Sequence, residues 1–394
     1  MRNKDNLVKG AECVMKFQDV KSLEERLQLM EGFAQRFLSR AEKIDEEGSF
    51  PFENLAELKT SGYTSLTVPK EYGGEGISLY EFVRLQEYIA RGDGSTALSI
   101  GWHMGIVKDL GEKKPWHESM LDMLFKDVKA GALINNCASE RQTGSPTRGG
   151  KPTTTAVKVG DKWIINGRKT FSTMSPMLDY FNVTATIQES GEVGYFLIPR
   201  DTKGVQVEET WDSIAMRGTG SHDLVLTNVK LAEKYLVQLS EPGNKSPAGW
   251  LLHIPACYLG IAQAAQTYAI EFAKDYAPNS ITGSIIDLPN VQQKIGEMEL
   301  ELMRARHFLH SVAKQWDNSN EEQQGRMAPE LGAVKYAVTN ASIAVVDLAM
   351  RIVGARSLSQ KNPLQRYYRD VRAGLHNPPM DDMTIMLLGR NASK

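Results

Sequence analysis

The apolar residues of the first 130 positions recur at the three- and four-residue spacing of an amphipathic helix. One stripe runs through residues 23–38, a second helix is predicted over residues 79–90, and a third begins near Ser95. The prolines and glycines of residues 68–76 predict a loop between the first and second of these helices. We therefore expect an N-terminal helical domain over residues 1–130.

The pattern changes near Gly131, where short runs rich in β-branched and aromatic residues replace the helical spacing. Gly160-Asp161 and Asn166-Gly167 are dipeptides of the kind that two-residue hairpin turns prefer. These features predict a central antiparallel, β-barrel-like domain over residues 131–240. Its predicted strands cover residues 152–159, 162–171, 180–187, 194–199, 205–211 and 222–231.

Helical spacing returns after Pro247 and continues to the end of the chain. Two long apolar stripes, over residues 291–312 and 331–352, alternate steps of three and four, and the polar residues 316–329 between them predict a loop. Such stripes are typical of long, nearly antiparallel helices in a four-helix bundle, which we expect over residues 241–394. The predicted fold class is mainly α with a central β-domain.

Composition narrows the functional class. The 394 residues carry 46 Lys and Arg against 48 Asp and Glu, a balance that argues against a nucleic-acid partner or a polybasic membrane patch. We find no secretory signal and no apolar run near the about 20 residues that span a bilayer. Cys13, Cys137 and Cys257 lie far apart, which disfavours a disulfide framework or a Cys-rich metal site. A cytoplasmic enzyme is expected.

Two segments of the predicted β-domain could carry chemistry. Residues 136–140, followed by Thr143-Gly144-Ser145, form a polar stretch that could bind a phosphate or a heterocycle edge, or could be a plain solvated loop. Residues 163–173 end in Phe171 and Thr173, and an aromatic face beside a hydroxyl suits a flat ligand such as an isoalloxazine ring. Taken alone, a residue such as Phe171 is more often an ordinary core residue.

Several short motifs, each weak alone, occur in an order and spacing that resemble the acyl-CoA dehydrogenase superfamily over nearly the whole chain. That resemblance implies an FAD enzyme built from a helical domain, a β-barrel-like domain and a four-helix domain. The motifs are Val68-Pro-Lys-Glu-Tyr-Gly-Gly74, Ala138-Ser-Glu140 with Gly144-Ser145, Ile165-Asn-Gly-Arg-Lys169 with Ser172-Thr173, Met216-Arg-Gly-Thr-Gly-Ser221 and Arg369-Asp-Val-Arg372.

The resemblance also implies roles for cofactor-binding residues. Cys137, Ser139 and Ser145 would line the flavin and its pyrophosphate, while Phe171 would cover one side of the ring and Thr173 would lie near its N5 edge.

A second set of cofactor contacts would come from a neighbouring subunit. Residues 351–355, including Arg351 and Gly354, match a segment that reaches the neighbour's FAD, so a homo-oligomer, dimer or tetramer, is expected. Residues 276–287 depart from the family's adenine-binding pattern, which leaves FMN open beside FAD.

The catalytic glutamate of typical family dehydrogenases is missing. That glutamate removes the α-proton of an acyl-CoA while the β-hydrogen leaves as hydride to flavin N5. Alignment on Arg369-Asp370 places Pro378 at its position, and the alternative family position, on the first helix of the terminal bundle, holds Trp250. Neither of these two glutamate positions supplies a carboxylate, and proline also supplies no N–H.

Residues 375–382 instead resemble a flavin monooxygenase branch of the superfamily through Leu375-His-Asn-Pro378. Those enzymes take reduced flavin from a separate reductase and form a C4a-hydroperoxide beside a histidine. His376 is therefore the candidate catalytic residue, since an imidazole can move protons at neutral pH. The alternative is that His376 and Asn377 end one helix while the two prolines begin the next.

Four further side chains are candidates for the substrate pocket: Trp102, His103, Trp250 and His253. Glu140 and Arg217 are expected to stabilise loops, with pairing to a phosphate as the alternative role of Arg217. Asp381 and Asp382 are expected to complement the dipole of the last helix. No metal site is expected.

The expected function is α,β-dehydrogenation of an acyl thioester with an electron acceptor as redox partner, and the family resemblance implies that the thioester is an acyl-CoA. The first alternative is a two-component flavin monooxygenase of the same fold, served by a flavin reductase. The second is a catalytically idle acyl-thioester binder or scaffold.

Overall fold

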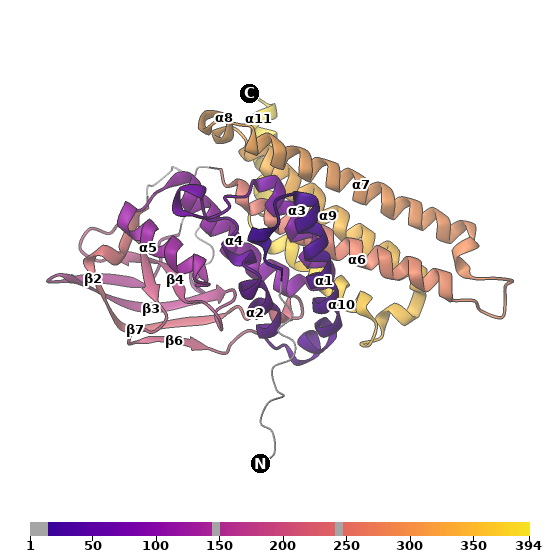
Figure 1. Ribbon diagram of the computed structural model, residues 1–394, viewed down its shortest axis with the longest axis horizontal. Coiled ribbons are helices and arrows are strands. Elements are labelled where there is room, and N and C mark those ends of the chain that lie inside the picture. The colour runs from indigo at the N-terminus through magenta and orange to yellow at the C-terminus, as the bar shows by residue number, and fades with distance from the viewer. Residues whose placement is uncertain (1–14, 144–149, 241–246) are drawn as a thin grey trace, which may run out of the picture.

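The computed structural model describes residues 15–143, 150–240 and 247–394. The β-sheet lies at one end of the molecule, the long helices of the terminal bundle extend from the other, and the first helices lie between them (Figure 1). This arrangement confirms the predicted fold class of helical flanks around a central sheet domain.

The N-terminal helices confirm the predicted apolar stripes. Ser22 caps the first helix through a capping box with Glu25, and Gly48 ends it at a φ of 62°. Asp93 separates the third and fourth helices, and its carboxylate accepts the N–H of Thr96 at 2.8 Å. The helices are α1 (Leu23–Glu47), α2 (Phe52–Thr60), α3 (Leu79–Gly92), α4 (Gly94–Lys113) and α5 (Glu118–Lys129).

The central sheet contains all six predicted strands and two shorter ones that the pattern did not reveal. Its strands are β1 (Ile134–Cys137), β2 (Thr155–Val159), β3 (Lys162–Ser172), β4 (Tyr180–Ile187), β5 (Val193–Pro199), β6 (Val205–Glu208), β7 (His222–Ala232) and β8 (Leu236–Leu239). Their order is β6-β7-β3-β2-β4-β5-β8, with β1 also paired to β4.

Two ladders correct the expectation of a wholly antiparallel sheet. β1 and β2 both pair with β4 in parallel, one after the other along the same edge. A parallel ladder needs a long connection, which local turn signals do not reveal. The Gly160-Asp161 turn between β2 and β3 is confirmed by the pairing of Val159 with Lys162.

Asn166-Gly167 is not a turn, in contrast to the prediction. Both residues lie inside β3, where the register with β7 shifts between Ile165 and Gly167. A side chain at Gly167 would come within 2.4 Å of the Thr154 hydroxyl oxygen, so the glycine permits a close approach of two backbones.

The C-terminal helices form the predicted bundle. They are α6 (His253–Asp275), α7 (Pro289–Asp317), α8 (Glu321–Gly325), α9 (Ala328–Val353), α10 (Pro363–Ala373) and α11 (Asp381–Ala392). α6, α7, α9 and the shorter α10 pack together, and the short α8 lies within the predicted loop.

One helical segment of the bundle has the length and composition of a membrane-crossing helix. Within residues Ala328–Leu358, an 18-residue stretch has a mean hydropathy of 1.4, a run that the composition argument had not recognised. Its α-helical part, α9, packs on α6 and α7, and core helices of globular proteins pass the same test.

A buried carboxylate fastens the N-terminal helices to the bundle. Glu87 of α3 accepts hydrogen bonds at 2.9 and 2.7 Å from Arg306 of α7, and His310 lies 3.3 Å from its other oxygen. Burial opposes ionisation of Glu87, but these two partners outweigh it and hold its pKa below the ordinary value.

Replacing Glu87 with Gln is expected to lower the free energy of unfolding by about 2 kcal/mol, because Arg306 loses a charged acceptor. The contribution of Glu87 is complete at neutral pH. It is lost as the pH falls from about 4.3, the pKa of an unfolded glutamate, through the lower pKa of the folded state. Urea unfolding at several pH values measures both effects, and the wild type should lose more stability than E87Q on acidification.

The matched control is Glu301→Gln. It removes a more exposed ion pair between Glu301 and Arg304, which both lie on α7, the helix that carries Arg306. Its expected cost is below about 1 kcal/mol. Equal costs for the two variants would contradict the role assigned to Glu87.

Candidate active site

The end of β3 presents an aromatic side chain to solvent. The register of β3 against β7 shifts between Lys169 and Ser172, and Phe171 adopts a φ of 55° within this irregularity. Its side chain is 62% exposed and meets Trp211 edge-on with ring centroids 5.9 Å apart. Positive φ is uncommon for a bulky residue and occurs often at ligand sites. Phe171 is therefore not a core residue, and the two rings form an exposed aromatic ledge.

Hydroxyl groups form a short chain beside this ledge. Thr173 Oγ1 lies 2.9 Å from Ser221 Oγ, which lies 2.8 Å from Thr219 Oγ1. The Asn135 side-chain amide donates to the Thr173 carbonyl at 2.8 Å and so ties this segment to β1. Thr173 is only partly buried, and its hydroxyl can donate to or accept from a ligand. The sequence motifs contained Thr219 and Ser221, but spacing alone did not single them out.

A buried ion pair anchors β3 two residues before Phe171. Lys169 Nζ donates to Glu140 Oε1 at 2.6 Å, and both side chains are at most 2% exposed. The backbone N–H groups and hydroxyls of Thr153 and Thr154 also donate to Glu140. Although burial opposes ionisation, these donors lower the pKa of Glu140 to about 2. The expected loop-stabilising role of Glu140 is confirmed.

The loop after β1 lies against β3, but only part of it faces outward. The Ser139 carbonyl accepts the N–H of Thr170 at 2.9 Å, and the Ser139 side chain is partly exposed. Cys137 is 1% exposed, and burial raises the pKa of its thiol to about 12. Its side chain faces the core, so the expectation that it lines a cofactor is wrong for the thiol. Ser145 lies outside the described residues.

A short helical turn, Gly374–His376, precedes Pro378, the residue at the aligned glutamate position. His376 ends this turn and is exposed, and no side chain among the described residues pairs with it. The Tyr258 hydroxyl donates to Asn377 Oδ1 at 2.5 Å and fastens the segment to α6. The following helix, α11, begins only at Asp381, so Pro378 and Pro379 precede it rather than start it.

The acidic start of α11 matches its expected helix-dipole role and adds an ion pair. Asp381 and Asp382 are the first two residues of the helix. Asp381 also binds the buried Lys335 of α9 at 2.9 Å and accepts from Asn340 at 3.0 Å.

Carboxylates near the ledge and the adjoining loop already have partners. Asp223 accepts from Arg168 at 2.7 Å. Asp370 accepts the backbone N–H of Met216 at 2.6 Å, and burial raises its pKa to about 7. Arg217 donates to the Asp45 carbonyl at 2.6 Å, which confirms its loop-anchoring role. In the described parts of the chain no group of three or more His, Cys, Asp or Glu side chains is arranged to hold a metal ion.

Three of the four predicted pocket residues cluster, and the fourth does not. Trp102, Trp250 and His253 contact one another through their rings. His103 is fully buried, accepts the Ile134 N–H through Nδ1 at 3.1 Å, and has Nε2 2.9 Å from the Thr64 carbonyl. Burial lowers the pKa of His103 to about 4. Its role is to join α4 to β1, and it lines no open pocket.

The predicted inter-subunit segment lies at the end of α9. Arg351 and Gly354 are both exposed, and Gly354 ends the helix at a φ of 70°. The altered residues 276–287 begin at Tyr276, whose ring lies 4.3 Å beneath the Arg356 guanidinium.

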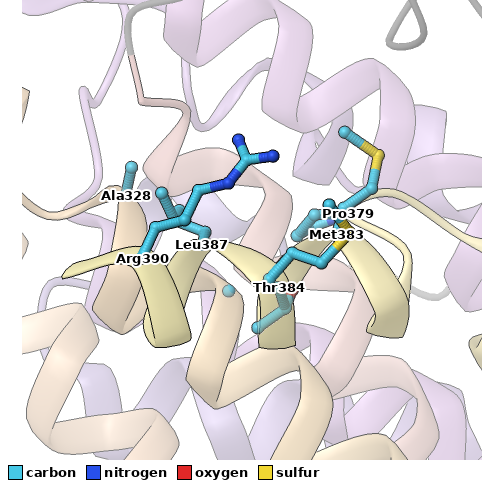
Figure 2. A pocket seen from close by; sticks show the side chains of 8 residues that line it. Ala328, Pro379, Met383, Thr384, Leu387 and Arg390 are labelled. Atoms are coloured by element: carbon cyan, nitrogen blue, oxygen red, sulfur yellow. The ribbon is translucent and has the colours of Figure 1, made fainter. Parts of the chain in front are cut away.

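A separate cleft of about 310 Å³ lies between the start of α9 and α11. Figure 2 shows Leu387 and Arg390 on one side of it and Pro379 and Met383 on the other. The cleft is mainly apolar, and none of the predicted cofactor-binding residues lines it. Sequence spacing gave no signal for it, because it forms between helices distant in the chain.

Comparison with known families and structures agrees with this architecture. Models of the acyl-CoA dehydrogenase N-terminal, middle and C-terminal domains match residues 22–112, 136–229 and 252–377. The chain is 55% identical over 360 residues to "Putative acyl-CoA dehydrogenase YdbM" of Bacillus subtilis (strain 168), covering 91% of this chain and 94% of the relative.

Two solved structures share the fold. Butyryl-CoA dehydrogenase of Megasphaera elsdenii superposes with a TM-score of 0.83 at 20% identity, over 95% of this chain and 99% of that one. FMN-bound TdsC of Paenibacillus sp. A11-2 gives 0.83 at 24% identity, over 93% and 96%. At these identities the likeness concerns the fold alone.

Glu140→Gln is expected to destabilise the protein by about 3–5 kcal/mol, because it leaves Lys169 buried without a counter-charge. The double variant E140Q/K169M should recover most of that loss, since no unpaired charge remains. Chemical unfolding measures the stability of both variants. The control is Glu208→Gln, which removes the more exposed carboxylate that pairs with Arg168. If E140Q costs no more than E208Q, the buried pair does not hold this region.

Proposed function

This chain belongs to the acyl-CoA dehydrogenase family of flavin oxidoreductases, and from that premise we propose that it dehydrogenates an acyl thioester between its α and β carbons. The observation that carries the proposal is the match along nearly the full length of a 55%-identical relative bearing that family name. The substrate class proposed is an acyl-CoA or a similar thioester.

The exposed end of β3 fits a flavin. Phe171 and Trp211 offer an apolar surface for a flat ring, and Thr173 and Ser221 offer hydroxyls for its polar edge. When bound there, the flavin would supply the acceptor for the hydride that leaves the substrate. The cofactor proposed is FAD, with FMN also compatible, because residues 276–287 lack the family's adenine-binding pattern.

The proton that leaves the α carbon needs an acceptor, and His376 is our candidate. Neither Pro378 nor Trp250 can take a proton, and the carboxylates of Glu140, Asp223 and Asp370 already have partners. His376 is exposed and lies two residues before Pro378. An imidazole side chain is the most frequent general base in proteins.

A specific observation favours a second candidate function. A carboxylate is absent from both glutamate positions, whereas a histidine stands in the terminal segment, as in the flavin monooxygenase branch. In that case the protein would receive reduced flavin from a separate reductase, and His376 would move a proton during oxygen activation. An idle acyl-thioester binder is the remaining alternative.

We further propose a homo-oligomer in the cytoplasm, with an electron acceptor or a flavin reductase as redox partner. The exposure of Arg351 and Gly354 at the end of α9 leaves this segment free to contact a second subunit. Its proposed role is to complete the neighbour's cofactor site.

Anaerobic mixing of the flavin-loaded protein with acyl-CoAs separates these functions. Dehydrogenation predicts bleaching of the oxidised flavin, and His376→Gln is expected to slow it at least about 100-fold, the usual contribution of a proton-transfer group. His117→Gln, which removes an exposed histidine before α5, is the matched control and should leave the rate unchanged.

The other outcomes are equally decisive. No bleaching by any thioester, together with a transient oxygen-dependent absorbance after mixing reduced flavoprotein with oxygen, would establish the monooxygenase and exclude the dehydrogenase. Thioester binding without either signal would support the alternative of an idle acyl-thioester binder. Bleaching that proceeds equally fast in H376Q would remove His376 from the mechanism.

A further inference from the structure

His253 is enclosed by three aromatic rings. It begins α6 and is fully buried, with the Trp250 ring parallel to it at 5.9 Å and the Phe82 ring stacked at 6.1 Å on a 25° tilt. Trp102 of α4 meets the imidazole edge-on at 5.1 Å. Phe82 and Trp250 are buried, whereas Trp102 is only partly so, and it forms the side of the enclosure nearest to solvent.

Three buried side-chain atoms of His253 and Gln86 have no hydrogen-bond partner among the described residues. Neither ring nitrogen of His253 makes a hydrogen bond within the described part of the chain, and neither does Gln86 Oε1 of α3. Gln86 is itself fully buried, with its amide nitrogen donating to the Ala97 carbonyl at 2.5 Å. Buried polar groups are nearly always hydrogen-bonded, so three unpaired atoms in one region indicate a missing partner.

His253 and Gln86 converge on the same point of α4. A side chain at Gly101 would come within 2.3 Å of His253 Nδ1 and 2.6 Å of Gln86 Nε2. One turn further, a side chain at Gly105 would come within 2.3 Å of the Trp250 ring. These glycines allow the rings of His253 and Trp250 to pack against the helix backbone, so the arrangement depends on residues at five positions in three segments of the chain.

The enclosure is joined to the proposed flavin site by one strand. His103, next to Trp102 on α4, binds the first residue of β1, Ile134. Asn135 follows in β1 and binds the carbonyl of Thr173. A substrate that reacts beside Thr173 and whose tail reaches Trp102 and His253 would lie along β1.

We infer that His253, together with Gln86, recognises a hydrogen-bonding group on the tail of the substrate, and that the substrate is an acyl or aryl-acyl thioester whose tail carries a hydroxyl. This inference rests on the proposed function and makes its substrate class more specific. His253 would be a specificity-determining residue and takes no part in the bond changes.

The chemistry of the two side chains favours a hydroxyl. Burial lowers the pKa of His253 to about 3, so its imidazole is neutral, with one donor nitrogen and one acceptor nitrogen. A hydroxyl can accept from the donor nitrogen and donate to Gln86 Oε1 at the same time. One hydroxyl would pair two of the three atoms, whereas a purely apolar tail would leave all three unpaired. A site built to bind a hydroxyl discriminates strongly against ligands that lack it.

Binding of matched ligand pairs tests this inference without requiring turnover. Calorimetry on the flavin-loaded protein would compare ω-hydroxyhexanoyl-CoA with hexanoyl-CoA, and para-hydroxyphenylpropanoyl-CoA with phenylpropanoyl-CoA. At least one hydroxylated ligand is expected to bind about 10-fold more tightly than its partner. His253→Phe keeps the aromatic stack and should abolish that preference, and Gln86→Leu should reduce it.

Thermal unfolding tests whether the variant loses its preference only because the protein is destabilised. His253→Phe removes unpaired buried atoms, so it should not lower the melting temperature. Equal affinities within both pairs would overturn the inference alone and would mean that internal water satisfies His253. A preference that persists in H253F would overturn it as well. If no thioester of either pair binds, the proposed function fails first and the inference falls with it.

Discussion

The buried ion pair between Glu140 and Lys169 is the interaction on which the candidate site depends. Lys169 lies two residues before Phe171 in β3, and Glu140 follows Ser139 in the loop that leaves β1. Because a charge in this interior is tolerable only with its partner, the pair fixes the loop against the strand. The irregular end of β3 can then project Phe171 outward while Thr173 stays next to Ser221.

The chemistry of the site follows from which polar groups are engaged and which are free. Glu140 and Asp223 accept hydrogen bonds from charged donors that lower their pKa, which suits them to structure rather than to proton transfer. His376 and His253 make no hydrogen bond with another residue of the described chain, and one is exposed while the other is enclosed by aromatic rings. Their surroundings assign them different tasks: proton transfer with solvent access, and recognition of a neutral polar group.

Local pattern predicted most of the fold but not its long-range contacts. The helical stripes and six strands were recognisable because burial of one face imposes a period on the sequence. The sequence pattern did not reveal β1, because its four residues, two of them asparagine, carry no such period and its partner β4 lies far along the chain. Asn166-Gly167 had the composition of a turn, yet packing against Thr154 placed it inside a strand. The burial of Cys137 and His103 likewise depends on partners that spacing cannot identify.

Photolabelling with an azidoflavin tests the central claim most directly, because it reports where the ring lies whatever reaction the protein performs. The account predicts covalent labelling of peptides that contain Phe171, Thr173 or Trp211, suppressed by excess unlabelled flavin. Suppressible labelling confined to the cleft between α9 and α11, at Met383 or Leu387, would contradict it, as would the absence of any labelling that unlabelled flavin suppresses.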